Sequence, residues 1–364
     1  MKRRILLASA LLLAVGGCSG GTKADPPVAN PTPTLTPPPT VAIRGEARML
    51  SGTAQVSFLH RAARVGAVYG FGADGRRIDY VATDYVATET GIARTPGSRI
   101  PDFAAYTYVR SVGDKFDFVA DPRNPPLTIN HAVYVDYDGL TSDRQVRAVA
   151  PSAATGKVLC LGDSIAAGAH TAAQFYSGND SQSWCGLIRK FLGPASTVEN
   201  VSVPGAVVGG ALGQLDDLVA RRADTAVIAY GMNDHISGGV DAAQFRTDLD
   251  TVVGRLKAEG VRVILVGFFQ RNPLYALEDP ARTAAFNEAI RLVAQGRGVA
   301  LVDVQAGFPK AAPAGAPVFT HLTADFLHHP NVYGQRVYFS LIVPHFLKRD
   351  MWASEIEDYV LADW

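Results

Sequence analysis

Residues 158–165, Val-Leu-Cys-Leu-Gly-Asp-Ser-Ile, decide the fold of this chain. Their apolar start predicts a short buried strand. Gly162 permits a tight exit from that strand, and Ser164 falls where the strand gives way to a loop. A serine at such a corner exposes its hydroxyl and frees its backbone N–H to stabilise an oxyanion. Gly, Asp and Ser are also ordinary turn residues, so the function must be argued from further segments.

Three later segments carry the other groups that acyl transfer from a serine requires. Residues 200–205 (Asn-Val-Ser-Val-Pro-Gly) place the unhindered N–H of Gly205 after a short apolar strand. Residues 229–234 (Ala-Tyr-Gly-Met-Asn-Asp) place the side-chain amide of Asn233 at another strand end. Residues 325–331 (Asp-Phe-Leu-His-His-Pro-Asn) supply a carboxylate and an imidazole base. With the serine, they provide nucleophile, base, orienting acid and oxyanion donors.

The order and wording of these four segments resemble the SGNH (GDSL) hydrolase family. The resemblance spans residues 157–334 and implies a flavodoxin-like hydrolase fold with Ser164 as the nucleophile. It also implies that the backbone N–H groups of Ser164 and Gly205 and the amide of Asn233 bind the oxyanion. Asp325 and a neighbouring histidine would complete the triad. The absence of Gly-x-Ser-x-Gly around Ser164 argues against the nucleophile elbow of α/β-hydrolases.

Two adjacent histidines compete for the role of base. Spacing favours His328, because Asp-x-x-His is the usual motif of the family and Asp325 precedes His328 by three residues. The following Pro-Asn favours His329, because a proline with a locked φ fixes the local turn. We favour His329 slightly, which makes His328 a rim residue. Adjacent histidines before a proline also fit a solvated loop or half of a metal site.

The N-terminus predicts export from the cell. Residues 1–4 are basic at three positions, residues 5–15 are apolar, and residues 16–18 read Gly-Gly-Cys. This pattern is typical of a secretory signal and is too short for a membrane span. Its end resembles a bacterial lipobox, which implies cleavage before Cys18 and lipidation there. Without an acidic residue after the cysteine, we expect an outer-membrane anchor facing the periplasm; an ordinary signal peptide is the alternative.

The chain divides into four predicted parts. Residues 1–17 form the signal peptide, and the Pro-rich residues 18–40 form an extended tether. Residues 41–150 contain short strand-like runs between Gly, Pro and Asp turns, which predicts a small all-β sandwich or jelly-roll-like domain. Residues 151–364 alternate strand and helix patterns, which predicts an α/β domain with a parallel sheet flanked by helices. The site residues fall at carboxyl ends of strands, where such sheets bind ligands.

The predicted elements can be stated by residue range. In the first domain, strands are expected at 54–59, 65–69, 80–86 and 132–137. In the second, strands are expected at 157–161, 198–203, 225–230, 261–267 and 299–302, and helices at 184–191, 211–222, 242–259, 282–295 and 333–348. Four tyrosines of the first domain suit either a sugar-stacking surface or ordinary strands: Tyr80, Tyr85, Tyr106 and Tyr108.

Composition limits the partners of the protein. Lys plus Arg equals Asp plus Glu at 34 each, so no basic field attracts nucleic acid. Beyond Cys18 the chain has two cysteines, Cys160 and Cys185, which form either a disulfide in an oxidising periplasm or two buried thiols. Neither His-Glu-x-x-His nor Cys-x-x-Cys occurs, so we expect no metal and no cofactor.

These features together predict a serine esterase that hydrolyses O-acyl esters of carbohydrate, most simply O-acetyl esters, through an acyl-enzyme. A lipid or aryl esterase and an O-acyltransferase of the same family are the alternatives among enzymes. Phe268-Phe269 and Leu274-Tyr275 could line a moderate acyl pocket. A tethered glycan-binding protein with a vestigial hydrolase domain is the alternative that is not an enzyme.

Overall fold

In the computed structural model, Pro38–Trp364 form one compact unit. The predicted signal peptide, Cys18 and nearly all of the predicted tether lie outside the described residues. No described helix is long and apolar enough to cross a membrane. The structure describes residues 39–72, 74, 76–103, 111–112, 115–116, 132–141, 146–150, 155–169, 180–237, 239–312, 318–325, 327–347 and 358–361.

A five-stranded parallel sheet forms the centre of the α/β part. Its strands lie in the order β12 (Thr197–Asn200), β11 (Lys157–Gly162), β13 (Thr225–Ala229), β14 (Arg262–Val266) and β15 (Ala300–Val302). The strand order reverses at β11, since the next strand in sequence lies on one side of β11 and all later strands lie on the other. A flavodoxin-like sheet binds its ligand at such a reversal. The expected α/β fold class is confirmed.

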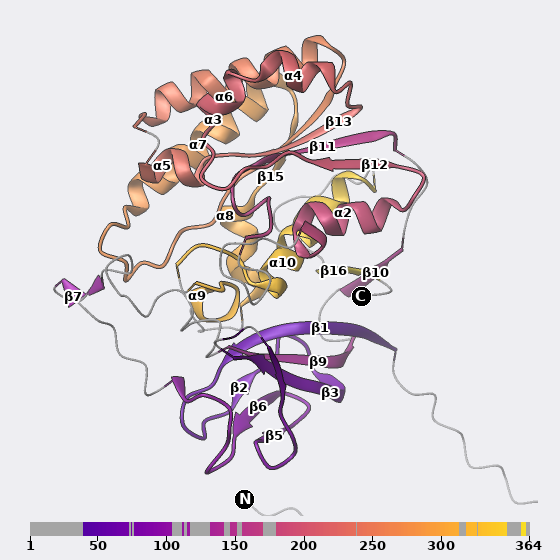
Figure 1. Ribbon diagram of the computed structural model, residues 1–364, viewed down its shortest axis with the longest axis vertical. Helices are drawn as coiled ribbons and strands as arrows, with labels where there is room; N and C mark the ends of the chain where they lie inside the picture. Colours follow the sequence, from indigo (N-terminus) through magenta and orange to yellow (C-terminus); the bar gives the residue numbers. More distant parts are fainter. Residues whose placement is uncertain are drawn as a thin grey trace, which may run out of the picture. The chain divides into compact units, whose positions relative to one another are not determined.

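Helices cover both faces of this sheet (Figure 1), with α6 and α7 on one side and α2 and α10 on the other. Helix α6 turns Phe245, Leu249, Val252 and Leu256 inward at helical spacing, so its apolar stripe faces the core. The helices are α2 (Trp184–Leu192), α3 (Val208–Leu212), α4 (Leu215–Ala220), α5 (Met232–Ser237), α6 (Ala242–Ala258), α7 (Pro280–Arg297), α8 (Val304–Gly307), α9 (Val318–His321) and α10 (Val332–Ile342). Short 3₁₀ turns occur at Asp180–Gln182, Phe308–Ala311 and Val343–His345.

Two helix predictions were wrong in extent. The helix expected at 211–222 is two short helices, because α3 ends at Gly213 and glycine is a poor helix former. The helix expected at 333–348 ends at Ile342 and continues as a 3₁₀ turn. Pro344 has no backbone N–H and disfavours helical geometry at the residue before it, so the α-helix stops there.

The N-terminal part contains two antiparallel sheets, which confirms the all-β domain. One sheet has the order β1 (Thr40–Met49), β9 (Ala132–Leu140), β3 (Ala62–Phe71) and β4 (Arg77–Asp79); the other has the order β2 (Val56–Ser57), β6 (Gly91–Arg94) and β5 (Tyr85–Ala87). A small hairpin adds β7 (Ser111–Val112) and β8 (Lys115–Phe116). The prediction of a single strand at 80–86 was wrong. A turn lies between β4 and β5, and within it Asp84 accepts the N–H of Val81.

The tyrosines proposed for sugar stacking do not form one exposed surface. Tyr80 is only 7% exposed and lies against Gly70, so its ring faces are not available to a sugar. Tyr85 is half-buried in β5. Tyr106 and Tyr108 lie outside the described residues. The described part of the chain therefore gives this surface no support.

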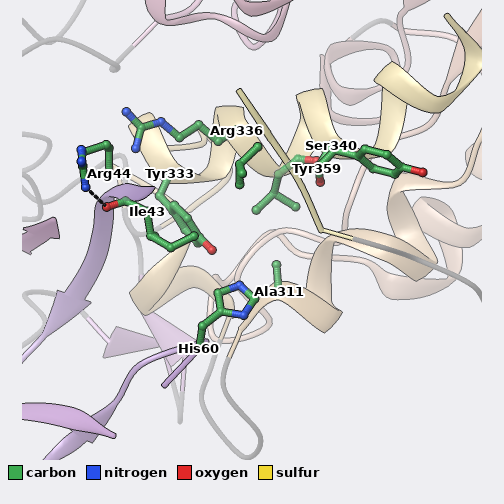
Figure 2. Close-up of a pocket in the computed structure, with 10 residues that line it drawn as sticks. Ile43, Arg44, His60, Ala311, Tyr333, Arg336, Ser340 and Tyr359 are labelled. Carbon is green, nitrogen blue, oxygen red and sulfur yellow. Dashed lines mark hydrogen bonds between the residues drawn. The ribbon is translucent and has the colours of Figure 1, made fainter. Parts of the chain in front are cut away.

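A short strand near residue 360 pairs with a strand that directly precedes the α/β part. Strand β16 (Asp358–Leu361) pairs in parallel with β10 (Val146–Val149). Beside them, a cavity of about 20 Å³ separates β1 from α10 (Figure 2), with Arg44 on the strand and Tyr333 and Arg336 on the helix. A cavity of this volume holds about one or two water molecules, so the contact between β1 and α10 is nearly closed.

Candidate active site

The nucleophile turn begins where β11 ends. Gly162 allows the chain to leave the sheet tightly, since a Cβ at this position would lie 2.8 Å from the carbonyl oxygen of Ala229. Asp163 then accepts the N–H of Ile165 through Oδ1 at 2.9 Å, and the carbonyl of Ser164 accepts the N–H of Ala169 at 2.9 Å. These bonds fix the turn, and Ser164 is held with 7% of its surface exposed.

The second half of the site is a short loop before α10. Asp325 is 2% exposed, and its Oδ1 accepts three backbone N–H groups, those of Leu327, His328 and His329, at 2.9, 2.9 and 3.0 Å. Asn331 closes the loop because its side chain caps α10 through the N–H of Gly334 and donates to the carbonyl of His321. The carboxylate therefore has a fixed direction, with Oδ2 turned toward the histidines.

The structure brings Ser164, His329 and Asp325 into one hydrogen-bonded chain. Ser164 Oγ lies 2.9 Å from His329 Nε2, and His329 Nδ1 lies 2.5 Å from Asp325 Oδ2. A carboxylate can only accept here, so His329 Nδ1 carries the proton and Nε2 is left to accept the hydroxyl proton of Ser164. Of the two candidate histidines, the structure thus places His329 against the serine. His328 Nδ1 lies 3.9 Å from the same Oδ2, beside the His329 ring.

The residues predicted to bind an oxyanion lie in two connected segments. Gly205 is exposed and has φ of +80°, a conformation that favours glycine. The amide of Asn233, at the start of α5, donates to the carbonyl of Ala206 at 3.1 Å, so it is joined to the Gly205 loop. The same loop is anchored to the nucleophile strand, because the N–H of Val203 donates to the carbonyl of Gly162 at 3.0 Å.

Three further connections hold the nucleophile turn in place. A disulfide joins Cys160 of β11 to Cys185 of α2, with a Cα–Cα distance of 6.2 Å. Asn200 of β12 donates to the carbonyl of Ala166 at 2.9 Å. Gln335 of α10 is fully buried and donates to the carbonyl of Ile165 at 2.8 Å. Sequence reasoning missed Gln335, since a polar residue on an apolar helix carries no signal of its partner.

Two buried acids beside the site were also missed. Burial raises the pKa of Asp163 to about 6, although the N–H of Ile165 and the charge of His329 oppose this. Burial likewise raises the pKa of Asp234 to about 6. Asp234 is the neighbour of Asn233 and accepts the N–H of Val208 at 2.9 Å, which joins α5 to the start of α3, just after the Gly205 loop. The Gly-Asp-Ser and Asn-Asp motifs thus each contain an aspartate, Asp163 and Asp234, that accepts a backbone N–H near the site.

Comparison with known proteins supports one family. Residues 160–337 match the GDSL-like Lipase/Acylhydrolase family. Esterase TesA of Pseudomonas aeruginosa is 32% identical over 154 residues, which cover 41% of this chain and 71% of TesA.

Solved structures show similar coverage. The crystal structure of TesA matches with 29% identity and a TM-score of 0.42 over 52% of this chain and 96% of that chain. A variant of Axe2, an acetyl xylan esterase from Geobacillus stearothermophilus, matches with 20% identity and a TM-score of 0.44 over 56% of this chain and 99% of that chain. By its family match and its relation to TesA, this chain belongs to the GDSL-like lipase/acylhydrolase family and is a serine hydrolase of ester bonds.

Proposed function

We propose that the protein hydrolyses esters through an acyl-enzyme on Ser164. The observation that carries the proposal is the continuous chain from Ser164 Oγ through His329 to Asp325. As Oγ attacks the ester carbonyl, its proton passes to His329 Nε2, and Asp325 stabilises the resulting imidazolium. Collapse of the tetrahedral intermediate breaks the ester C–O bond, and the leaving alkoxide takes that proton. Water then attacks the acyl-serine by the same route and releases the acid.

The oxyanion of both intermediates requires neutral hydrogen-bond donors. The N–H groups of Ser164 and Gly205 and the side-chain amide of Asn233 supply them in this proposal. Two bonds support it: Asn233 donates to Ala206, next to Gly205, and Asp234 accepts the N–H of Val208 at the start of α3. Together they connect α5, which carries Asn233, to the chain that follows Gly205. Loss of one such donor costs about 10² to 10³ in rate.

Ser164→Ala tests the catalytic assignment. We expect the variant to lose turnover and labelling by a serine-reactive phosphonate, while its circular dichroism and melting temperature stay those of the wild type. Asn233→Ala should still be labelled but should turn over about 10² to 10³ times more slowly. A folded Ser164→Ala variant with full activity would rule out the acyl-enzyme on this residue.

For the substrate we propose O-acyl esters of carbohydrate, most simply acetyl esters. Support comes from the closed surroundings of the nucleophile turn. The cavity that adjoins it, lined by Asp163, Ile165 and Tyr230 among others, measures about 10 Å³, which is room for one water molecule. Phe268 and Phe269, expected to line an acyl pocket, are buried at 3% and 1% exposure. Neither feature offers a pocket for a long acyl chain, whereas an acetyl group requires no such pocket.

A lipid ester is the second candidate, favoured by a different observation. Apolar side chains are exposed close in sequence to the oxyanion residues: Val203, at 56%, precedes Gly205, and Ile236, at 38%, follows Asn233. Leu277 is 70% exposed in the loop after β14. An acyl chain lying on the surface rather than in a pocket could contact such residues.

Acetate release separates the two candidates. Purified protein is incubated with acetylated xylan and acetylated peptidoglycan, and with nitrophenyl esters of increasing chain length, with Ser164→Ala as the control. Acetate that is released from a polysaccharide by the wild type only would establish a carbohydrate esterase. Activity that rises with chain length without acetate release would establish the lipid candidate. Transfer of the acetyl group to an added sugar acceptor would instead identify an O-acyltransferase.

We further propose that the protein is a lipoprotein of the cell envelope, anchored through Cys18 and facing the periplasm from the outer membrane. The Cys160–Cys185 disulfide supports an oxidising compartment. Detergent phase partition of the mature protein tests the anchor. Wild type should enter the detergent phase and Cys18→Ala the aqueous phase; equal partition of both would contradict lipidation.

A further inference from the structure

His328 is the one titratable residue of the Asp-Phe-Leu-His-His segment that the proposed reaction does not use. Its side chain is 13% exposed and that of His329 is 15% exposed. Their ring centroids lie 4.1 Å apart. Both Nδ1 atoms face one oxygen of Asp325: Oδ2 lies 2.5 Å from His329 and 3.9 Å from His328. Two imidazole nitrogens and a carboxylate oxygen thus converge at one point.

We propose that Asp325, His328 and His329 form an inhibitory zinc site. Two histidines and a carboxylate are a donor set that binds Zn²⁺ with a fourth position left to water. Their ligand atoms all lie within 4.8 Å of one another. Bonds of about 2.0–2.1 Å in a tetrahedral site place ligand atoms about 3.3 Å apart. The two Nδ1–Oδ2 distances, 2.5 and 3.9 Å, need to change by less than 1 Å each to meet this value.

The carboxylate is prepared for this role by its other oxygen. Asp325 Oδ1 accepts three backbone N–H bonds, which orient the group and turn Oδ2 toward the two histidines. Outer contacts of this kind fix the direction of a metal ligand. The approach is from the side of the histidines, because Asp325 itself is 2% exposed.

Zinc at this site stops the proposed reaction whichever nitrogen of His329 it binds. At Nδ1 it displaces the proton to Nε2, which lies 2.9 Å from Ser164 Oγ and then can only donate. At Nε2 it occupies the lone pair that accepts the serine proton. In both cases Ser164 keeps its proton and no acyl-enzyme forms. The inhibition, though not the binding, rests on the proposed role of His329.

Substitution of His328 tests the site without touching the proposed triad. His328→Phe keeps a ring beside His329 but removes the nitrogen donors, and His345→Phe in the 3₁₀ turn after α10 is the matched control. Zinc binding is measured by equilibrium dialysis, and ester hydrolysis is measured in a zinc series relative to each variant's own zinc-free rate. We expect wild type and His345→Phe to bind one zinc ion per chain and to lose activity. His328→Phe should need at least about tenfold more zinc for both effects.

The possible results separate the site from the reaction. No zinc binding by the wild type, or unchanged binding in His328→Phe, would overturn the proposed site. Zinc binding that depends on His328 but leaves hydrolysis unaffected would overturn the inhibition, and it would also contradict the role of His329 as the base.

Discussion

Asp163→Asn should stabilise the protein, although Asp163 precedes the nucleophile. The carboxyl is 2% exposed, and burial raises its pKa from 3.8 to about 6. A pKa raised this far corresponds to about 3 kcal/mol of native stability that is lost once the carboxyl is ionised. The unfolded chain therefore loses this proton before the native protein does. Native stability is lost as the pH rises from about 4 through about 6, and the loss is constant above that.

The asparagine removes this loss and keeps the oxygen that accepts the N–H of Ile165. We expect its free energy of unfolding to exceed that of the wild type by about 3 kcal/mol at pH 8 and by about half of that at pH 5. Urea unfolding of the oxidised protein at both pH values measures the difference. Asp217→Asn, at an exposed position of α4, is the control and should change stability by less than about 0.5 kcal/mol. An Asp163→Asn gain that is equal at both pH values, or a loss at pH 8, would refute the reasoning.

Two further substitutions test the supports of the site. Replacing Cys160 and Cys185 together by Ala opens a loop of 25 residues, and chain entropy predicts a loss of about 3.5 kcal/mol in the free energy of urea unfolding; an unchanged midpoint would contradict it. Gly205→Ala forces a Cβ onto a φ of +80°, so we expect kcat/KM to fall by about 10² while the melting temperature changes little. A wild-type rate in this variant would remove the Gly205 N–H from the oxyanion site.

Much of the α/β fold could be predicted, because its signals are local. An apolar run that ends in glycine marks β11, and the alternation of apolar strands with helical stripes requires a parallel sheet. The pairing of β10 with β16 could not be predicted in this way. Val146 lies opposite Asp358, and two short strands so far apart in sequence carry no periodicity that specifies each other.

The candidate site likewise contains residues that the local sequence predicts and features that only the assembled fold produces. Ser164, Asn233 and Asp325 stand in motifs whose residue types already state a chemical role. Gln335 does not, because its importance comes from reaching the carbonyl of Ile165 with one end and the N–H of Trp184 with the other. The raised pKa of Asp163 likewise depends on burial, which is a property of the assembled fold.

Two effects of similar size and opposite sign act at β11 and the turn that follows it. The buried carboxyl of Asp163 destabilises the protein by about 3 kcal/mol at pH 8, and the disulfide three residues before it stabilises the protein by about 3.5 kcal/mol. If the disulfide compensates for the buried acid beside the nucleophile, the variant that lacks both cysteines should regain wild-type stability when Asp163→Asn is added. The two changes lie close enough to couple, so a double-mutant cycle at pH 8 and pH 5 measures whether they do. Independent changes predict that Asp163→Asn restores about 3 kcal/mol at pH 8 and about half of that at pH 5, as it does with the disulfide intact. A larger gain without the disulfide, seen at pH 8 and smaller at pH 5, would show that the disulfide opposes the charge of Asp163.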